Sequence, residues 1–192
     1  ETKIDILVTP IVTILVGIGL SCLIAAPIGA AASAVGEAVK WATNQQPFIM
    51  GLLVSVVVGI ALTLPISSAA ICAALGLSGV SGVALAAIAS GNPEVAVGLA
   101  KAGGAAVAGC CAQMIGFAVM TYKENGVGGL FAQGLGTSML QVSNIVKNPW
   151  IVVPPTLAGA ITGPMATCLF KMSNIPSGAG MGTCGLVGQI GT

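Results

Sequence analysis

Residues 41–93 read WATNQQPFIMGLLVSVVVGIALTLPISSAAICAALGLSGVSGVALAAIASGNP, and no Asp, Glu, Lys or Arg occurs among them. A bilayer core about 30 Å thick is crossed by about 20 apolar helical residues. The run is therefore too long for one membrane span and long enough for two, or for one span and a re-entrant hairpin. The polar break from Thr63 to Ser68 predicts irregular backbone at membrane depth, which is tolerated only inside protein or beside a wet cavity.

The composition of the whole chain also indicates a membrane protein. Hydrophobic residues make up 56% of it and charged residues 6%, whereas a soluble domain is about a quarter charged. We therefore predict an all-α, polytopic transmembrane helix bundle with broken or re-entrant segments and about five to six spans. The net charge of +1, without any Arg, excludes nucleic acid as a direct partner.

The positions of charges, Pro and Gly divide the chain into expected segments. Pro27 predicts the end or a kink of the first span, and Gln46-Pro47 restarts the chain. The Gly-rich residues 78–101, with Gly91-Asn92-Pro93-Glu94, predict a solvent-facing loop. Residues 127–146 are too polar for a lipid-facing span and predict a re-entrant or cavity-lining segment. The expected spans are residues 6–26, 48–64, 102–122 and 150–170.

The domain organisation that we expect is a single transmembrane domain over residues 1–192, as part of a longer protein. Thr63-x-Pro65 with Cys72 is matched by Thr162-x-Pro164 with Cys168. Matched broken segments are typical of inverted-repeat transporters. The match therefore raises the hypothesis of repeat halves at residues 1–91 and 102–192, although chance accounts for it easily in a chain so rich in Gly and Ala.

Neutral polar side chains within apolar surroundings are the candidates for solute binding. Uncharged amides and hydroxyls are costly at membrane depth unless paired, and they offer both donors and acceptors, as a polyol requires. We predict that the break and the polar segment line one cavity for a neutral, sugar-like solute. The candidate substrate-binding residues are Thr63, Ser67, Ser68, Gln113, Gln133, Thr137, Ser138, Gln141 and Asn144.

Structural roles compete with solute binding for the same side chains. The hydroxyls near Pro65 can satisfy the carbonyls that this proline leaves free. The amides can hold helices together through interhelical hydrogen bonds. For Gln113 we expect a position on the protein-facing side of its span, because an amide turned to lipid is costly.

Glu124 is the one candidate for a catalytic or coupling group. It is the carboxylate next to the polar half of the chain, and it would act as a proton acceptor if it folded inward. Its neighbours Lys123 and Asn125-Gly126 equally indicate an ordinary interfacial loop. The chain has no His, no clustered carboxylates and no phosphate-binding loop, so we expect no metal, no cofactor and no self-contained catalytic site.

The six cysteines are interpreted as reduced packing residues, because none has CxxC spacing and all lie in apolar or Gly-rich surroundings. A redox pair at Cys110-Cys111 is the alternative, but adjacent residues of a helix point to different faces. Gly159-x-x-x-Gly163 and Gly178-x-x-x-Gly182 fit close helix packing. Packing within the chain is favoured there over a dedicated dimer face.

Several longer motifs resemble those of a known family. They are QPFIMG at residues 46–51, ALTLPISSAAICAALGLSG at 61–79, GCCAQMIGFA at 109–118, GLGTSMLQ at 134–141 and GMGTCGLVG at 180–188. The chain resembles the EIIC-like membrane family of the phosphotransferase system, in the branch that includes regulators of perfringolysin. The resemblance covers nearly the whole chain, but the Gly-Ile-Thr-Glu-Pro-type signature of the glucose group is missing.

The resemblance implies a sugar permease of the bacterial cytoplasmic membrane, which moves its solute while an EIIB partner phosphorylates it. It also implies EIIB and EIIA proteins as partners, besides membrane lipid, the solute and a second copy in a homodimer. Two other functions stay open. The chain could be a membrane-embedded regulator that binds a ligand without moving it, or a secondary transporter coupled to ions through Glu124 or Glu37.

Overall fold

The computed structural model describes residues 5–43, 46–64, 67–77 and 81–192, and all regular elements in these ranges are helical. The predicted all-α class is confirmed. Contacts divide the chain into two units, Glu1–Ala34 and Val35–Thr192. The elements are α1 (Asp5–Thr43), α2 (Pro47–Thr63), α3 (Ser68–Ala74), α4 (Gly82–Ala89), α5 (Pro93–Met120), α6 (Tyr122–Phe131), η1 (Ala132–Gly136), η2 (Ser138–Gln141), α7 (Val142–Lys147), η3 (Pro149–Val152), α8 (Val153–Pro164), η4 (Met165–Leu169), α9 (Pro176–Ala179), η5 (Cys184–Leu186) and α10 (Val187–Ile190).

The first unit consists of the larger part of α1. The sequence predicted an end or a kink of the helix at Pro27 and then a second helix; α1 does not end there but continues as one element to Thr43. An apolar environment offers no water to unpaired backbone groups, so a helix tends to be kept across a proline there. Side chains of residues 11–27 are exposed and almost all are apolar or small.

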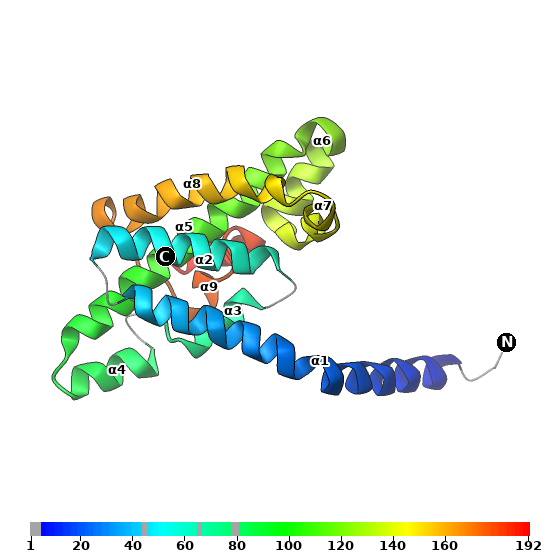
Figure 1. The fold of residues 1–192 in the computed structure, drawn as a ribbon, viewed down its shortest axis with the longest axis horizontal. Helices are drawn as coiled ribbons and strands as arrows, with labels where there is room; N and C mark the ends of the chain where they lie inside the picture. The colour runs from blue at the N-terminus through cyan, green and yellow to red at the C-terminus, as the bar shows by residue number, and fades with distance from the viewer. Residues whose placement is uncertain (1–4, 44–45, 65–66, 78–80) are drawn as a thin grey trace. The chain divides into compact units, whose positions relative to one another are not determined.

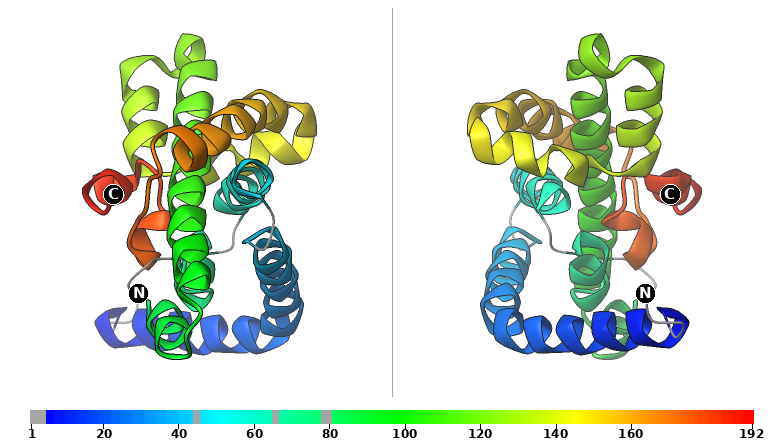
Figure 2. Two further views of the ribbon diagram at one scale, coloured as in Figure 1. Left: turned by 90° about the vertical axis from the view of Figure 1, so that its left-hand side faces the viewer. Right: turned by 90° about the vertical axis from the view of Figure 1, so that its right-hand side faces the viewer.

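The second unit is built on three helices, α2, α5 and α8, each of which packs against the other two (Figure 1). In Figure 2, α5 stands upright while α2 is seen nearly end-on, so that α2 crosses α5 at a steep angle. Met50, Val54, Val58, Ala106 and Met114 are buried where these helices meet. The valine-rich run of α2 is helical, as the sequence predicted.

Small residues spaced four apart bring α2 and α8 together in antiparallel directions. Ser55 Oγ donates to the carbonyl of Gly159 at 2.8 Å. One turn away, Gly51 faces Gly163, and a Cβ on either glycine would meet the backbone of the other. At the next turn Thr167 Oγ1 donates to the carbonyl of Pro47 at 2.9 Å. The Gly159-x-x-x-Gly163 motif therefore packs within the chain, as expected.

The predicted interruption of the helix after Thr63 is confirmed. Leu64 and Ser67 have extended backbone, α3 starts only at Ser68, and residues 65 and 66 lie outside the described part. The helix does continue through Pro164 into the π-helical turn η4. Of the two segments compared as a possible repeat, the helix thus ends at Thr63 in the first and runs through Pro164 in the second.

The predicted loop at residues 78–101 is wrong for most of its length. It contains α4 and the first nine residues of α5. Outside these helices are Ser81, which caps α4, and the turn at residues 90–92, while residues 78–80 lie outside the described ranges. Pro93 occupies the first turn of α5 with Glu94 beside it. Proline at the first helical position and an acidic first turn are helix-start signals, which the Gly-Asn-Pro turn signal obscured.

Two helical stretches in the described residues are long and apolar enough to cross a membrane, namely Pro93–Met120 and Pro149–Leu169. The segments Ile11–Pro27 and Pro47–Thr63 are apolar but shorter. Within the described ranges, the number of qualifying spans is thus smaller than the five to six expected. There α2 ends after 17 residues, and α6 to α7 are short helical segments.

Candidate functional site

The hydroxyl groups at the break mostly serve the backbone around them. Thr63 Oγ1 donates to the carbonyl of Ile60 at 2.7 Å, and Ser67 Oγ accepts from the amide of Ala70 at 3.2 Å, which caps α3. Ser68 Oγ donates to the carbonyl of Gly180 at 2.7 Å. The first two bonds satisfy backbone groups that the interrupted helix leaves free. The third joins α3 to the C-terminal end of α9.

The break and the middle of the polar segment 127–146 line one small cavity of about 150 Å³. Ser67 and Ser68 line it together with Gly136 and Thr137. Thr137 Oγ1 accepts from the amide of Met139 at 3.2 Å and so starts the turn η2. Pockets for small molecules usually hold about 300–1,000 Å³, so this cavity is small for a sugar.

The three amides of the polar segment form one directed chain of hydrogen bonds. Asn144 Nδ2 donates to Gln141 Oε1 at 2.9 Å, and Gln141 Nε2 donates to Gln133 Oε1 at 2.9 Å. Gln133 Nε2 then donates to Thr121 Oγ1 at 2.8 Å. We call these four residues the amide relay.

Thr121 determines the direction of the amide relay, and the sequence analysis missed it. Its hydroxyl proton is donated to the carbonyl of Phe117 at 2.9 Å, in the last turn of α5. Thr121 Oγ1 can therefore only accept from Gln133, which must present its nitrogen to Thr121 and its oxygen to Gln141. A threonine after an apolar helix is too common for its sequence to signal this role.

The amide relay borders a second cavity, of about 480 Å³, between α6 and the polar segment. Gln133, Gln141 and Asn144 line it together with Asn125, which was also not predicted, and with Gly128, Gly129, Ala132 and Leu140. After the bonds of the relay, each primary amide keeps a second N–H and each amide oxygen keeps a lone pair. The wall thus offers fixed donors and acceptors and no charged side chain.

Replacing Thr121 with Val should disorder the amide relay, because valine keeps the shape of threonine and removes its hydroxyl. We expect the free energy of unfolding to fall by about 1–3 kcal/mol, since Gln133 is almost fully buried and loses its acceptor. Thermal unfolding of the purified protein would measure this. Thr121→Ser keeps the hydroxyl and should restore most of the loss; equal unfolding temperatures for the two variants would contradict the assignment.

Two predicted residues are buried without a full set of partners. Gln113 is 1% exposed, which confirms that it faces the protein, and Ser138 is 0% exposed. Neither Gln113 Nε2 nor Ser138 Oγ has a hydrogen-bond partner among the described residues. Such groups cost stability and commonly mark water, a ligand or strain. They line neither cavity, so the structure does not join them to the amide relay.

Glu124 is exposed in the first turn of α6, while its neighbour Asn125 lines the amide cavity. The side chain of Glu37 lies outside the described part of the chain. No group of three His, Cys, Asp or Glu side chains occurs within the described ranges. The amide cavity is therefore lined by groups that can form hydrogen bonds with a neutral molecule.

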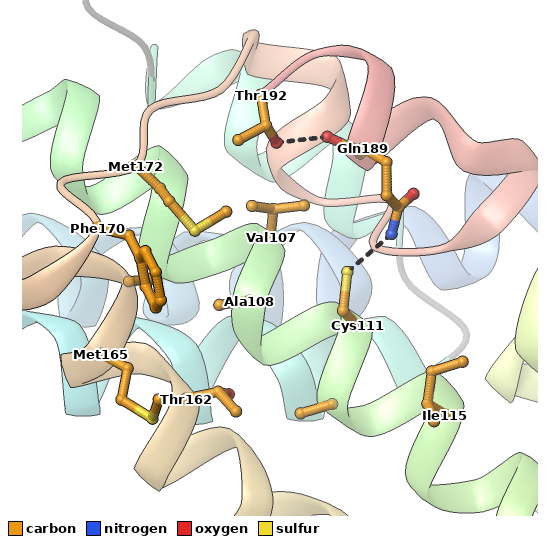
Figure 3. A pocket seen from close by; sticks show the side chains of 13 residues that line it. Val107, Ala108, Cys111, Ile115, Thr162, Met165, Phe170, Met172, Gln189 and Thr192 are labelled. Carbon is orange, nitrogen blue, oxygen red and sulfur yellow. Dashed lines mark hydrogen bonds between the residues drawn. The ribbon is translucent and has the colours of Figure 1, made fainter.

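A third cavity, of about 560 Å³, is lined mainly by apolar side chains of α5, η4 and the C-terminal residues (Figure 3). Cys111 lies on its wall and accepts a hydrogen bond from Gln189 Nε2 at 3.2 Å. Cys110 is buried on another face of α5, with Sγ 3.9 Å from the carbonyl of Val58. All six cysteines are free, and the adjacent pair points to different partners.

The comparison with protein families decides the class of this protein. The family described as "Phosphotransferase system, EIIC" matches residues 1–192, the full chain. The chain belongs to this family. It is thus a membrane component of phosphotransferase sugar transport, and it works with the EIIA and EIIB components of that system. No curated protein and no solved structure matches it.

Proposed function

We propose that this EIIC chain binds a small, neutral, hydroxylated solute in the cavity beside the amide relay and moves it across the bacterial cytoplasmic membrane. The observation that supports this most is the relay itself, with Gln133, Gln141 and Asn144 fixed around about 480 Å³ of space. This volume lies within the usual range for small-molecule pockets. A sugar or sugar alcohol fits this description.

The chemistry of the wall favours a neutral polyol over an ion. Each sugar hydroxyl donates one hydrogen bond and accepts others. A primary amide can accept the first through its oxygen and donate to the hydroxyl through its N–H groups. Because the hydrogen bonds of the relay already orient the amide side chains, little conformational entropy of these side chains is lost when a solute binds. Leu140, with Gly128 and Gly129, adds an apolar and closely approachable side for the C–H faces of a sugar ring.

The same proposal includes phosphorylation of the solute by EIIB during transport. It also includes contacts between membrane lipid and exposed apolar residues such as Leu157 and Ile161 on α8. The homodimer stays a prediction, which the mass of the purified protein in detergent would check. Uptake into liposomes distinguishes transport from ligand binding by a membrane-embedded regulator. Dependence of uptake on EIIB or on an ion gradient separates phosphotransfer from secondary transport.

Gln141→Ala is expected to weaken solute binding by about tenfold or more, because it removes both a wall group and the middle of the relay. Binding of a panel of hexoses and hexitols to the purified protein, measured by calorimetry, would test this. Ser67→Ala is the matched comparison, since Ser67 lines the small cavity and not the amide cavity. If Ser67→Ala lost more affinity than Gln141→Ala, the solute-binding site would have to be assigned to the small cavity at the break.

A further inference from the structure

Four residues with sulfur-containing side chains line the small cavity beside the break. The chain contains seven methionines and six cysteines. Met114, Met139, Met181 and Cys184 all line this one space of about 150 Å³. Met114 comes from α5, Met139 from η2, and Met181 and Cys184 from the residues that follow α9, Cys184 being the first residue of η5. The tertiary fold, and not the local sequence, therefore brings them together.

The surroundings hold part of this cluster in place. Met114 is fully buried, and its Sδ accepts a hydrogen bond from Thr183 Oγ1 at 3.4 Å. Gly182 has a φ of +56°, and a Cβ there would meet the backbone of Cys110. The turn that carries Met181 and Cys184 is therefore pressed against α5. No charged side chain lines the cavity.

Thioethers and a thiolate are soft ligands, which select Cu⁺ and similar monovalent ions over Mg²⁺, Ca²⁺ or Mn²⁺. Charge gives the same preference. One monovalent cation and one thiolate sum to zero, whereas a divalent cation would leave a net positive charge in a cavity with no acidic group to balance it, at a high desolvation cost.

We propose that Met114, Met139, Met181 and Cys184 form a binding site for a soft monovalent cation, with Cu⁺ as the natural candidate. Binding forms a bond between the metal and the sulfur of Cys184 and releases the thiol proton to solvent, without a change in oxidation state. Cys184 is half-buried, so the proton has a way out. A bound ion would connect α5, η2 and the C-terminal segment. This site is independent of the solute proposed for the amide cavity.

The test is Cu⁺ binding to the purified full chain under anaerobic conditions, in competition with a chromogenic Cu⁺ chelator. We expect one ion per chain with sulfur-only ligands in X-ray absorption. Met139→Leu and Cys184→Ala should each lower the affinity by about tenfold or more. Met120→Leu is the matched control, because Met120 is similarly exposed but lies outside the cavity.

Met139→Leu keeps the volume and the apolar character of the side chain and removes its sulfur. It therefore tests the proposal even if Cys184→Ala is unstable. Cu⁺ that binds equally well to Met139→Leu and to the original chain would overturn the proposal, since the exposed thiols of Cys22 and Cys168 would then explain it. Failure of the chain to compete with the chelator would overturn it as well.

Discussion

Gly109→Ala is expected to destabilise the protein by about 3 kcal/mol or more, because the new methyl group meets backbone and not a movable side chain. A Cβ at Gly109 would collide with the carbonyl of Ser55 and with its Cα and C atoms. Overpacking typically costs about 1–3 kcal/mol, and more where neighbours cannot move. Gly109→Val should prevent folding.

The collision at Gly109 affects all three core helices. Ser55 of α2 is bonded to Gly159 of α8, whose own Cβ position is 3.7 Å from the Cα of Gly109. Pushing α2 away therefore also strains its contact with α8. Thermal unfolding followed by size-exclusion chromatography would measure the effect.

Gly128→Ala is the control for this prediction. Gly128 lies in α6, and a Cβ there would have no neighbour within 4 Å. We expect little change, or a small gain because alanine favours helix. If Gly109→Ala unfolded at the same temperature as Gly128→Ala, the close crossing of α2 and α5 would be wrong.

Gln113→Met is expected to raise the free energy of unfolding by about 1–3 kcal/mol. The substitution keeps the shape of the side chain and removes the buried Nε2 group, which has no partner among the described residues. The core around it is apolar, with Met114 and Phe117 fully buried nearby on the same helix. Chemical or thermal unfolding in detergent would show the gain.

Gln133→Met is the matched comparison with the opposite expected sign. Gln133 is buried like Gln113, but its amide is hydrogen-bonded to both Thr121 and Gln141. This variant should lose stability by a similar amount. Transport measured on Gln113→Met separates two roles: unchanged transport indicates a structural cost only, and lost transport with gained stability indicates that the amide serves the solute. A less stable Gln113→Met would contradict the prediction.

The helical elements were largely predictable from the sequence, because local chemistry decides them. Pro47 starts α2, and Pro65 predicts its interruption. Residues 127–146, predicted as a re-entrant or cavity-lining segment, comprise the end of α6, the turns η1 and η2 and most of α7, and several of them line a cavity. The start of α5 at Pro93 was missed, since a Gly-Asn-Pro sequence serves equally as a turn and as a helix start.

The sequence by itself determined the class of the protein and the kind of groups at its candidate site. An apolar chain with few charges requires helices in a membrane, and neutral amides within it require partners. These are properties of composition and of neighbouring residues, so no knowledge of the tertiary structure is needed to derive them.

Only the tertiary structure decided which polar groups meet. The sequence predicted one cavity for the break and the polar segment, but Ser67 and Thr137 line a small sulfur-rich space while Gln133 and Gln141 line another. Thr121, 12 residues from Gln133, orients the relay, and Gly180, 112 residues from Ser68, accepts its hydroxyl. Such pairings follow from how the small residues of α2, α5 and α8 let the helices cross, and crossing geometry depends on all three helices at once.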